Sequence, residues 1–129
     1  MKDFINWGKT KIKLDGLATF RHPKEKEIWW CGIGVNIGSE VYGKGVRFSR
    51  PVLVINAEGG ETFVGIPLTS GVKTKKYSCV IKTDDEVLHT ALVYQIRSFD
   101  KRRLQEKMYT LSDKEYSLVY KYFQKLYKI

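Results

Sequence analysis

The chain has 129 residues, of which 43% are apolar and 29% are charged. These values are typical of one folded domain and exclude a disordered chain or a large two-domain enzyme. No apolar run approaches the ~20 residues that cross a bilayer, and the amino end lacks the apolar stretch of a secretory signal. We therefore expect a cytoplasmic protein with no membrane partner.

The net charge of +9 is unevenly distributed along the chain. Residues 1–26 carry seven Lys or Arg against three Asp or Glu, and residues 97–129 carry nine against four, whereas residues 27–96 carry seven of each. Such a bias attracts polyanions, among which nucleic acid is the commonest in the cytoplasm. A basic balance also occurs in proteins for which it only maintains solubility.

The first 17 residues predict an amphipathic helix. Its apolar stripe consists of Phe4, Trp7 and Leu14. Gly16 provides a place for this helix to end, and Pro23 then disfavours helical geometry at the residue before it. We therefore expect residues 1–26 to form a helix and an extended linker, and residues 27–129 to form the main domain.

Strand-like sequence begins at Glu27. The run Ile28–Cys31 predicts a strand, and a long loop punctuated by glycines follows it. The run Pro51–Ile55 is almost uniformly apolar, as expected for a strand that is buried on both faces. We expect it to pair with Thr62–Leu68 as a hairpin.

The second half of the chain predicts another hairpin and a terminal helix. Residues 77–82 and 87–95 predict two strands joined by an acidic turn. Ser112 and Glu115 form a capping-box pattern at the start of the helix. The apolar stripe of that helix is Tyr116, Val119, Tyr120, Phe123 and Tyr127. Short strands with helices at the chain ends, without βαβ alternation, indicate a small β-barrel with helical additions.

Several kinds of chemistry are excluded by the residues present. The glycines of Cys31–Gly38 match neither a dinucleotide-binding loop nor a phosphate-binding loop. No group of His, Cys and carboxylates has metal-ligand spacing, so we expect neither a metal nor a cofactor. His22 and His89 are expected to be surface or hydrogen-bonded residues without a catalytic role. Cys31 and Cys79 lie in apolar stretches and are expected to be buried thiols.

Four segments carry the most specific pattern in the chain. They are Glu27–Trp30 (compare GEIW), Gly38–Glu40 followed by Arg50–Ile55 (compare GSEQ and RPVLVI), Pro67–Ser70 (compare P-x-T) and Gln95–Leu104 (compare QIRTIDKxRL). Each segment alone is a weak signal. In this order and spacing, over roughly residues 27–125, they resemble the MazF/PemK (Kid) family of toxins from type II toxin–antitoxin systems.

This resemblance implies an α+β, mainly β fold: a small SH3-like barrel of the CcdB/MazF type with a C-terminal helix, here with an added N-terminal helix. It also implies a homodimer. Most members of the family are endoribonucleases that cut single-stranded RNA at short sequences without a metal, leave a 2′,3′-cyclic phosphate and a 5′-hydroxyl, and thereby block translation. A cognate antitoxin binds the dimer and closes the RNA channel.

By motif position, the resemblance assigns catalysis to Arg50, Thr69 and Glu40. Attack of a ribose 2′-hydroxyl on its own phosphate gathers negative charge, which a guanidinium can stabilise with two parallel donors. The Thr69 hydroxyl can donate to a phosphoryl oxygen, and Glu40 can orient the 2′-hydroxyl or accept its proton. The identity of the base and of the acid stays open. Each residue also has an ordinary structural alternative. Arg50 could be a solvated charge at the edge of a strand, Thr69 a routine strand residue, and Glu40 an acidic residue on the surface of the loop.

A larger set of residues is expected to bind the RNA. The set is Ser39, Tyr42, Arg47, Ser70, Lys73, Lys75, Lys76, Gln95 and Arg97. The late basic residues Lys101, Arg102 and Arg103 are further candidates for phosphate contacts. Tyr42, Phe48 and Trp30 are candidates for stacking on unpaired bases, although Trp30 also fits a core position.

The sequence departs from the family pattern at three places. Val41 stands where the loop usually has Gln, and the loop from Val41 to Ser49 is longer than usual, so its shape and base preference should differ. The Kid branch has a His and an Arg/Asp pair where this chain has Ser39, Leu92 and Tyr94, so the mechanism of that branch does not transfer. Residues 1–26 lie outside the common core and could pad the barrel, bind the antitoxin or cover the channel.

Two alternative functions stay open beside RNA cleavage. One is a non-catalytic module that binds nucleic acid or a partner on the same barrel. The other is a gyrase poison, because CcdB shares the architecture.

Overall fold

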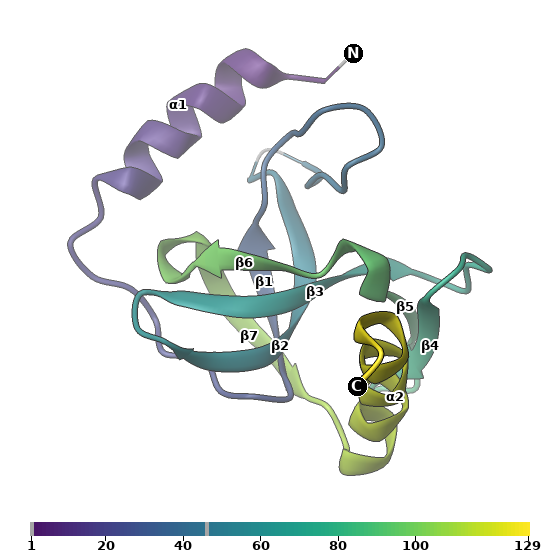
Figure 1. The fold of residues 1–129 in the computed structure, drawn as a ribbon. Helices are drawn as coiled ribbons and strands as arrows, with labels where there is room; N and C mark the ends of the chain where they lie inside the picture. The colour runs from purple at the N-terminus through teal and green to yellow at the C-terminus, as the bar shows by residue number, and fades with distance from the viewer. Residues whose placement is uncertain (1, 46) are drawn as a thin grey trace.

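The computed structural model describes residues 2–45 and 47–129, which form a mainly β fold with one helix near each end (Figure 1). Helix α1 covers Phe4–Asp15 and helix α2 covers Asp113–Tyr127. The strands are β1 Glu27–Gly32, β2 Ser49–Gly59, β3 Thr62–Ser70, β4 Ser78–Lys82, β5 Leu88–Leu92, β6 Arg97–Asp100 and β7 Leu104–Thr110. The 3₁₀ turns η1 Val93–Gln95 and η2 Lys101–Arg103 flank β6. The expected α+β, mainly β class is confirmed.

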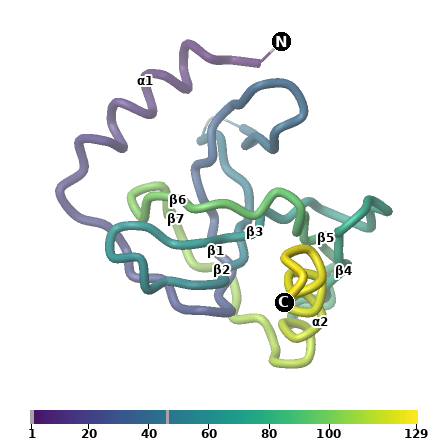
Figure 2. The backbone as a smooth tube through the Cα atoms, viewed as in Figure 1, coloured from purple at the N-terminus to yellow at the C-terminus, as the bar shows by residue number. Residues whose placement is uncertain are grey.

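All strand pairs are antiparallel, in the order β4-β5-β3-β2-β1-β7. Strand β3 changes partners along its length, since its first half pairs with β6 and its last residues pair with β5. This switch bends the sheet around its own core, and the tube in Figure 2 shows the resulting curl. Both predicted hairpins, β2–β3 and β4–β5, are confirmed.

Three features differ from the predicted elements. The second strand of the later hairpin ends at Leu92, and Val93–Gln95 forms a 3₁₀ turn in place of the predicted strand. Strands β6 and β7 were not predicted. Strand β6 has only four residues, and β7 is an edge strand whose single buried residue is Leu104, so neither shows a regular apolar alternation.

The sheet separates two apolar clusters. One is centred on Leu53 and Ile66 of β2 and β3 and is covered by Tyr116 and Val119 of α2. The other contains residues whose side chains lie on the opposite face of the sheet. They are Trp29, Cys31, Val52, Val54, Phe63, Phe99 and Leu104. Neighbouring residues of β2 therefore face different clusters, which explains the unbroken apolar run. The expected burial of both cysteines is confirmed.

Helix α2 begins as the capping pattern predicts. The Ser112 hydroxyl accepts a hydrogen bond from the backbone N–H of Glu115 at 3.3 Å. Tyr116 and Val119 are buried, and Tyr120 and Phe123 pack beside them. Burying one large side chain stabilises the fold by about 1.5–3 kcal/mol, so this stripe attaches the helix to the sheet.

Helix α1 lies outside the sheet and packs on the β1–β2 loop, residues 33–48 (Figure 1). The Trp7 ring is buried against Val35 and Phe48. Gly34 permits this contact, because a Cβ atom at its φ of +77° would lie 2.0 Å from the Trp7 ring. Lys2 Nζ donates to two carbonyls of the same loop, so α1 and the loop form one packed unit.

Candidate active site

The register of β2 and β3 brings Arg50 and Thr69 together. Val52 and Pro67 are the outermost pair of these strands, and Arg50 and Thr69 lie two residues beyond that pair, one on each strand. Both residues line one cavity at this end of the sheet. The Arg50 Nη1 atom also donates to the carbonyl of Leu68 at 3.3 Å, which holds the guanidinium one residue from Thr69.

The Arg50 guanidinium has a second anchor in the β1–β2 loop. Its Nε atom donates to the carbonyl of Tyr42 at 2.8 Å. Burial lowers the pKa of Arg50, yet a guanidinium stays charged at any physiological pH. The two recorded bonds use two of its five donors, so a fixed cation remains able to donate to a phosphate.

Glu40 lies in the same loop but serves the loop's own fold. Its Oε1 atom accepts from the backbone N–H of Ile37 at 2.9 Å, which closes a turn. Ser39 is exposed beside it. The Tyr42 ring is 38% exposed and lies under the ammonium of Lys2, with 4.9 Å between Nζ and the ring centroid.

Gln95 connects the other side of the barrel to this loop. Its Oε1 atom accepts from the backbone N–H of Val41 at 2.6 Å. Val41 precedes Tyr42, whose carbonyl holds Arg50. Gln95 therefore contributes to the position of Arg50 through two consecutive loop residues.

A cavity of about 400 Å³ borders this region at the ends of β1, β2, β3 and β5. Its lining includes Trp30, Arg50, Thr69, Ser70, His89 and Met108. Ser70 is the direct partner of His89, whereas Thr69 is the partner of Thr90. Because strand residues alternate between faces, the side chains of Ser70 and His89 leave the sheet on the side opposite to Thr69. Ser70 nevertheless lines the same cavity as Arg50 and Thr69.

The remaining expected RNA-binding residues lie on three surfaces. Lys73, Lys75 and Lys76 are exposed in the loop between β3 and β4. Arg97 is exposed on β6, with its guanidinium 4.7 Å from the centroid of the Phe99 ring. Arg47 forms an ion pair with Glu106 of β7 at 2.9 Å, so an RNA phosphate would have to compete with that carboxylate.

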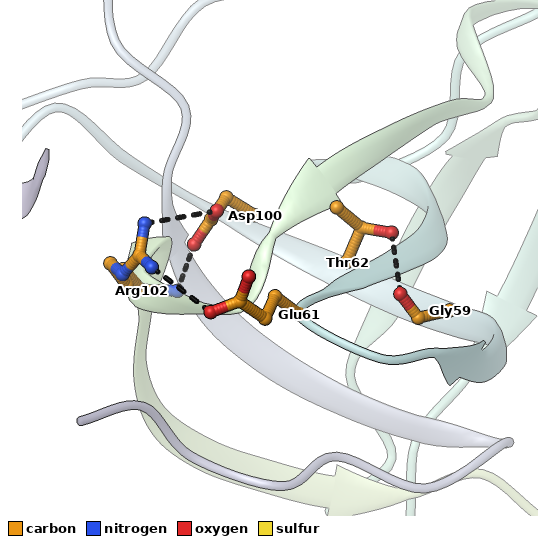
Figure 3. Close-up of polar contacts among 5 residues, drawn as sticks. All are labelled: Gly59, Glu61, Thr62, Asp100 and Arg102. Atoms are coloured by element: carbon orange, nitrogen blue, oxygen red, sulfur yellow. Dashed lines mark hydrogen bonds and ion pairs between the residues drawn. The ribbon is translucent and has the colours of Figure 1, made fainter. Parts of the chain in front are cut away.

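The late basic segment is engaged in the fold, in contrast to the expectation that it binds phosphates. Lys101 is 6% exposed and donates to the carbonyl of Ala57. Arg102 pairs with Asp100 and Glu61, which fastens η2 to the β2–β3 turn (Figure 3).

Arg103 and Phe48 also differ from the expectation that they bind RNA, because each side chain already makes contacts within the fold. Arg103 donates to the carbonyl of Gly32 and lies over the Trp7 ring. Burial, and then the charge of Arg97, lower the pKa of Arg103. Phe48 is 7% exposed in contact with Trp7, so its ring is not available to a base.

The described part of the chain lacks a candidate metal site and a membrane-spanning helix. Residues 2–45 and 47–129 contain no group of three or more His, Cys, Asp or Glu residues placed to hold a metal ion. Over the same residues, no helix has both the length and the apolar character that crossing a membrane requires.

Sequence reasoning missed the contacts that organise the site. The anchors of Arg50 are main-chain carbonyls of Tyr42 and Leu68, which no residue type encodes. It also missed Tyr77 and Tyr94, whose rings form a pair beside Gln95. The only sequence signal for that pair was the tyrosine directly before Gln95, which is Tyr94.

Comparison with known proteins identifies relatives of this architecture. A family model described as PemK-like, MazF-like toxin of type II toxin-antitoxin system matches residues 24–127. The fold is similar to MazF from Deinococcus radiodurans, with a TM-score of 0.69, 20% identity, and coverage of 84% of this chain and 99% of that chain. It is also similar to an endoribonuclease in complex with its cognate antitoxin from a mycobacterial species, with a TM-score of 0.63, 13% identity, and coverage of 83% and 96%. No curated protein is a significant match in sequence.

Proposed function

Since this chain belongs to the PemK-like, MazF-like toxin family of type II toxin–antitoxin systems, we propose that it is a toxin that cleaves single-stranded RNA at specific short sequences and thereby blocks translation. The solved relatives include proteins named as endoribonucleases, which supports this reaction class. The observation that carries the proposal is the fixed guanidinium of Arg50, whose Nη1 atom donates to the carbonyl of Leu68, one residue before Thr69, at a cavity that Thr69 also lines.

The proposed reaction is an internal transfer of the RNA phosphate. The ribose 2′-oxygen forms a bond to the adjacent phosphorus, and the bond from phosphorus to the 5′-oxygen of the next nucleotide breaks. The products are a 2′,3′-cyclic phosphate and a 5′-hydroxyl. One proton leaves the 2′-hydroxyl and one is added to the 5′-oxygen, so the chemistry requires no activated water and no metal ion.

In this reaction Arg50 and Thr69 stabilise the negative charge that develops on the phosphoryl oxygens. The guanidinium donates to the two non-bridging oxygens, and the Thr69 hydroxyl donates to one of them. The loop and strand contacts of Arg50 fix its plane before substrate binds, which avoids reorganisation in the transition state. Glu40 is the candidate base, and its Oε1 atom accepts from the N–H of Ile37, which leaves Oε2 to accept the proton.

The proposed partners follow from the same family. We propose that the chain forms a homodimer and that a cognate antitoxin protein inhibits it. Solved relatives include an endoribonuclease with its cognate antitoxin and MazE–MazF from Deinococcus radiodurans, the latter with a TM-score of 0.64, 16% identity, and coverage of 84% of this chain and 98% of that chain.

Incubation of the purified protein with single-stranded RNA in excess EDTA tests the nuclease. We expect cleavage at recurrent sites, with 5′-hydroxyl ends that can be mapped by sequencing. Arg50→Ala and Thr69→Ala should each lower the cleavage rate by about 10²- to 10³-fold while the circular dichroism spectrum is retained. Matched controls are Arg21→Ala in the exposed linker and Thr62→Ala at the other end of β3 (Figure 3).

Three outcomes contradict the nuclease. Intact RNA together with inhibited DNA supercoiling indicates a gyrase poison. Intact RNA without that effect indicates a binding or regulatory module. Cleavage that survives both Arg50→Ala and Thr69→Ala indicates a contaminating enzyme.

A further inference from the structure

A pair of tyrosines, one exposed and one partly buried, forms one wall of a hollow on the far side of Gln95. Tyr77, before β4, and Tyr94, in η1, have ring centroids 6.0 Å apart with planes inclined by 32°. Tyr94 is 67% exposed. The hollow measures about 350 Å³, and Lys75, Lys76 and Gln95 also line it.

The turn that carries Tyr77 is held in an unusual conformation. Tyr77 has a φ of +54°, in the left-handed region that bulky residues rarely adopt. The Ser78 hydroxyl accepts from the backbone N–H of Lys75 at 3.1 Å and donates to the Lys75 carbonyl, and the Ser78 N–H donates to the same carbonyl at 3.1 Å. Such strain persists only where surrounding contacts fix it, and it concentrates at binding sites.

The hollow is connected to the candidate active site by a short set of contacts. Gln95 lines the hollow and also accepts from the N–H of Val41. The next residue of the loop, Tyr42, holds the Arg50 guanidinium through its carbonyl. One extended strand of RNA could therefore lie across both places.

We propose that Tyr94, supported by Tyr77, is a stacking platform for one unpaired base of the RNA, and that Lys75 and Lys76 hold the phosphates beside that base. This subsite deepens the proposed function and rests on it. Aromatic faces next to lysines are the combination by which proteins hold single-stranded nucleic acid. The residues lining the hollow include two lysines and no carboxylate, so its charge suits a polyanion.

The ring geometry decides how the base would bind. A base inserted between two rings needs about twice the ~3.4 Å stacking spacing of nucleic acids, and the tyrosine rings are closer than that and tilted. One face of Tyr77 is also covered by Lys76, whose Nζ lies 5.5 Å from the ring centroid. The base must therefore stack on the exposed face of Tyr94, with Tyr77 behind it.

A binding measurement with uncleavable RNA isolates this subsite from catalysis. A short RNA carrying 2′-O-methyl groups cannot attack its own phosphate, so the protein keeps every active-site residue. Fluorescence anisotropy would give the Kd for wild type, Tyr94→Ala, Tyr94→Phe and Tyr77→Ala. The matched control is Tyr122→Ala, which removes an exposed tyrosine of α2 outside the hollow.

We expect Tyr94→Ala to weaken binding by about 5- to 100-fold, Tyr77→Ala to weaken it less, and Tyr94→Phe and Tyr122→Ala to stay within about twofold of wild type. Lys75→Ala and Lys76→Ala should each lower the slope of log K against log salt by about 0.7.

Each failure has a distinct meaning. If wild type binds the RNA and Tyr94→Ala, shown to be folded by its thermal midpoint, binds equally well, the subsite is wrong and the nuclease stands. If wild type cleaves no RNA but binds the methylated strand through Tyr94, the nuclease is wrong and the subsite stands. If wild type binds no RNA, both are wrong.

Discussion

The guanidinium of Arg50 is held in a fixed orientation by two hydrogen bonds. Arg50 lies near the start of β2, where Tyr42 of the loop and Leu68 of β3 each offer a carbonyl to its guanidinium. Both acceptors are main-chain atoms, so their positions depend on the strand register and on the loop path. The planar fork of Arg can use both and still present donors elsewhere, whereas a Lys ammonium is a single point charge.

Arg50→Lys should therefore lose cleavage although the charge is retained. We expect kcat to fall by about 10²-fold or more, with little change in the thermal midpoint, because the ammonium cannot reproduce the oriented pair of donors. RNA cleavage kinetics under excess EDTA provide the measurement, and Arg21→Lys is the matched control. Activity close to wild type would show that charge alone is sufficient at this position.

Glu27 is a second residue whose charge depends on its neighbours. Burial opposes its ionisation, but hydrogen bonds from Trp29 Nε1 and the Lys24 N–H, together with the ammonium of Lys107, outweigh burial and lower its pKa. The folded state therefore holds this proton less tightly than the unfolded state does. The stabilisation is complete above the unfolded pKa, near 4.5, and is lost as the pH falls through the lower folded value.

Glu27→Gln should flatten the acid limb of the stability curve. At pH 7 the variant should be less stable than wild type, because it lacks the charged acceptor. The difference between the two proteins should shrink between about pH 5 and pH 3, as wild type becomes protonated. Urea unfolding at a series of pH values measures this difference. A difference that does not change with pH would show that the Glu27 charge does not stabilise the fold.

At the scale of elements, the notable arrangement is α1 on the β1–β2 loop. Trp7 packs against both ends of the loop, at Val35 and Phe48, while Lys2 binds its first half and Gln95 its middle. The loop in turn carries the carbonyl that anchors Arg50. Helix α1 therefore packs on the loop that anchors Arg50, and its role in padding the barrel, binding the antitoxin or covering the channel stays a prediction.

Trp7→Ala should loosen the loop more than it destabilises the barrel. Removing a buried Trp costs about 3–5 kcal/mol where the cavity cannot collapse, and here the cost falls on the contact between α1 and the loop. We expect faster hydrogen exchange at the Val41 amide and faster proteolysis in the linker. Ile12→Ala, on the same helix at a position that is 75% exposed, should change neither. Unchanged exchange at Val41 in Trp7→Ala would show that Gln95 alone holds the loop.

The elements also show what the sequence can and cannot predict. Strands β2 and β3 were predictable because both faces are buried, which leaves an unbroken apolar run. Strand β7 carries mostly polar residues at a sheet edge, so its pairing with β1 follows from the fold and not from local pattern. Arg50 and Thr69 were selected by motif order, and their catalytic role stays a prediction. The contacts of Tyr42, Gln95 and Tyr94 were not predictable, because they depend on how distant segments meet.

At the scale of the whole molecule, the linker and the C-terminal helix close the barrel from opposite ends of the chain. The Tyr116 hydroxyl donates to Glu25 at 2.7 Å, and Lys26 pairs with Asp113 at 2.9 Å. The Leu111 N–H also donates to the carbonyl of Lys26 at 2.8 Å. These long-range bonds join segments that the sequence separates most widely, so the barrel is expected to unfold as one unit.

The proposed homodimer is a prediction at this scale. Light scattering at tens of micromolar protein should give twice the monomer mass, and dilution should shift the thermal midpoint because dimerisation stabilises the folded chain by mass action. A monomer mass throughout that range would contradict the assembly that the family suggests. The contact of Arg50 with the Leu68 carbonyl beside Thr69 lies within one chain and would be unaffected by that result.

The buried thiol of Cys31 can report when the sheet opens. Cys31 is the strand partner of Arg50 and is fully buried, and burial raises its pKa to about 12. Alkylating reagents react with the exposed thiolate, so they can modify Cys31 only when β1 and β2 separate. Cys79, buried between β4 and α2, offers a second such site in the other cluster. The native chain thus contains two chemical reporters, and their alkylation rates would measure how often each half of the sheet opens without any introduced label.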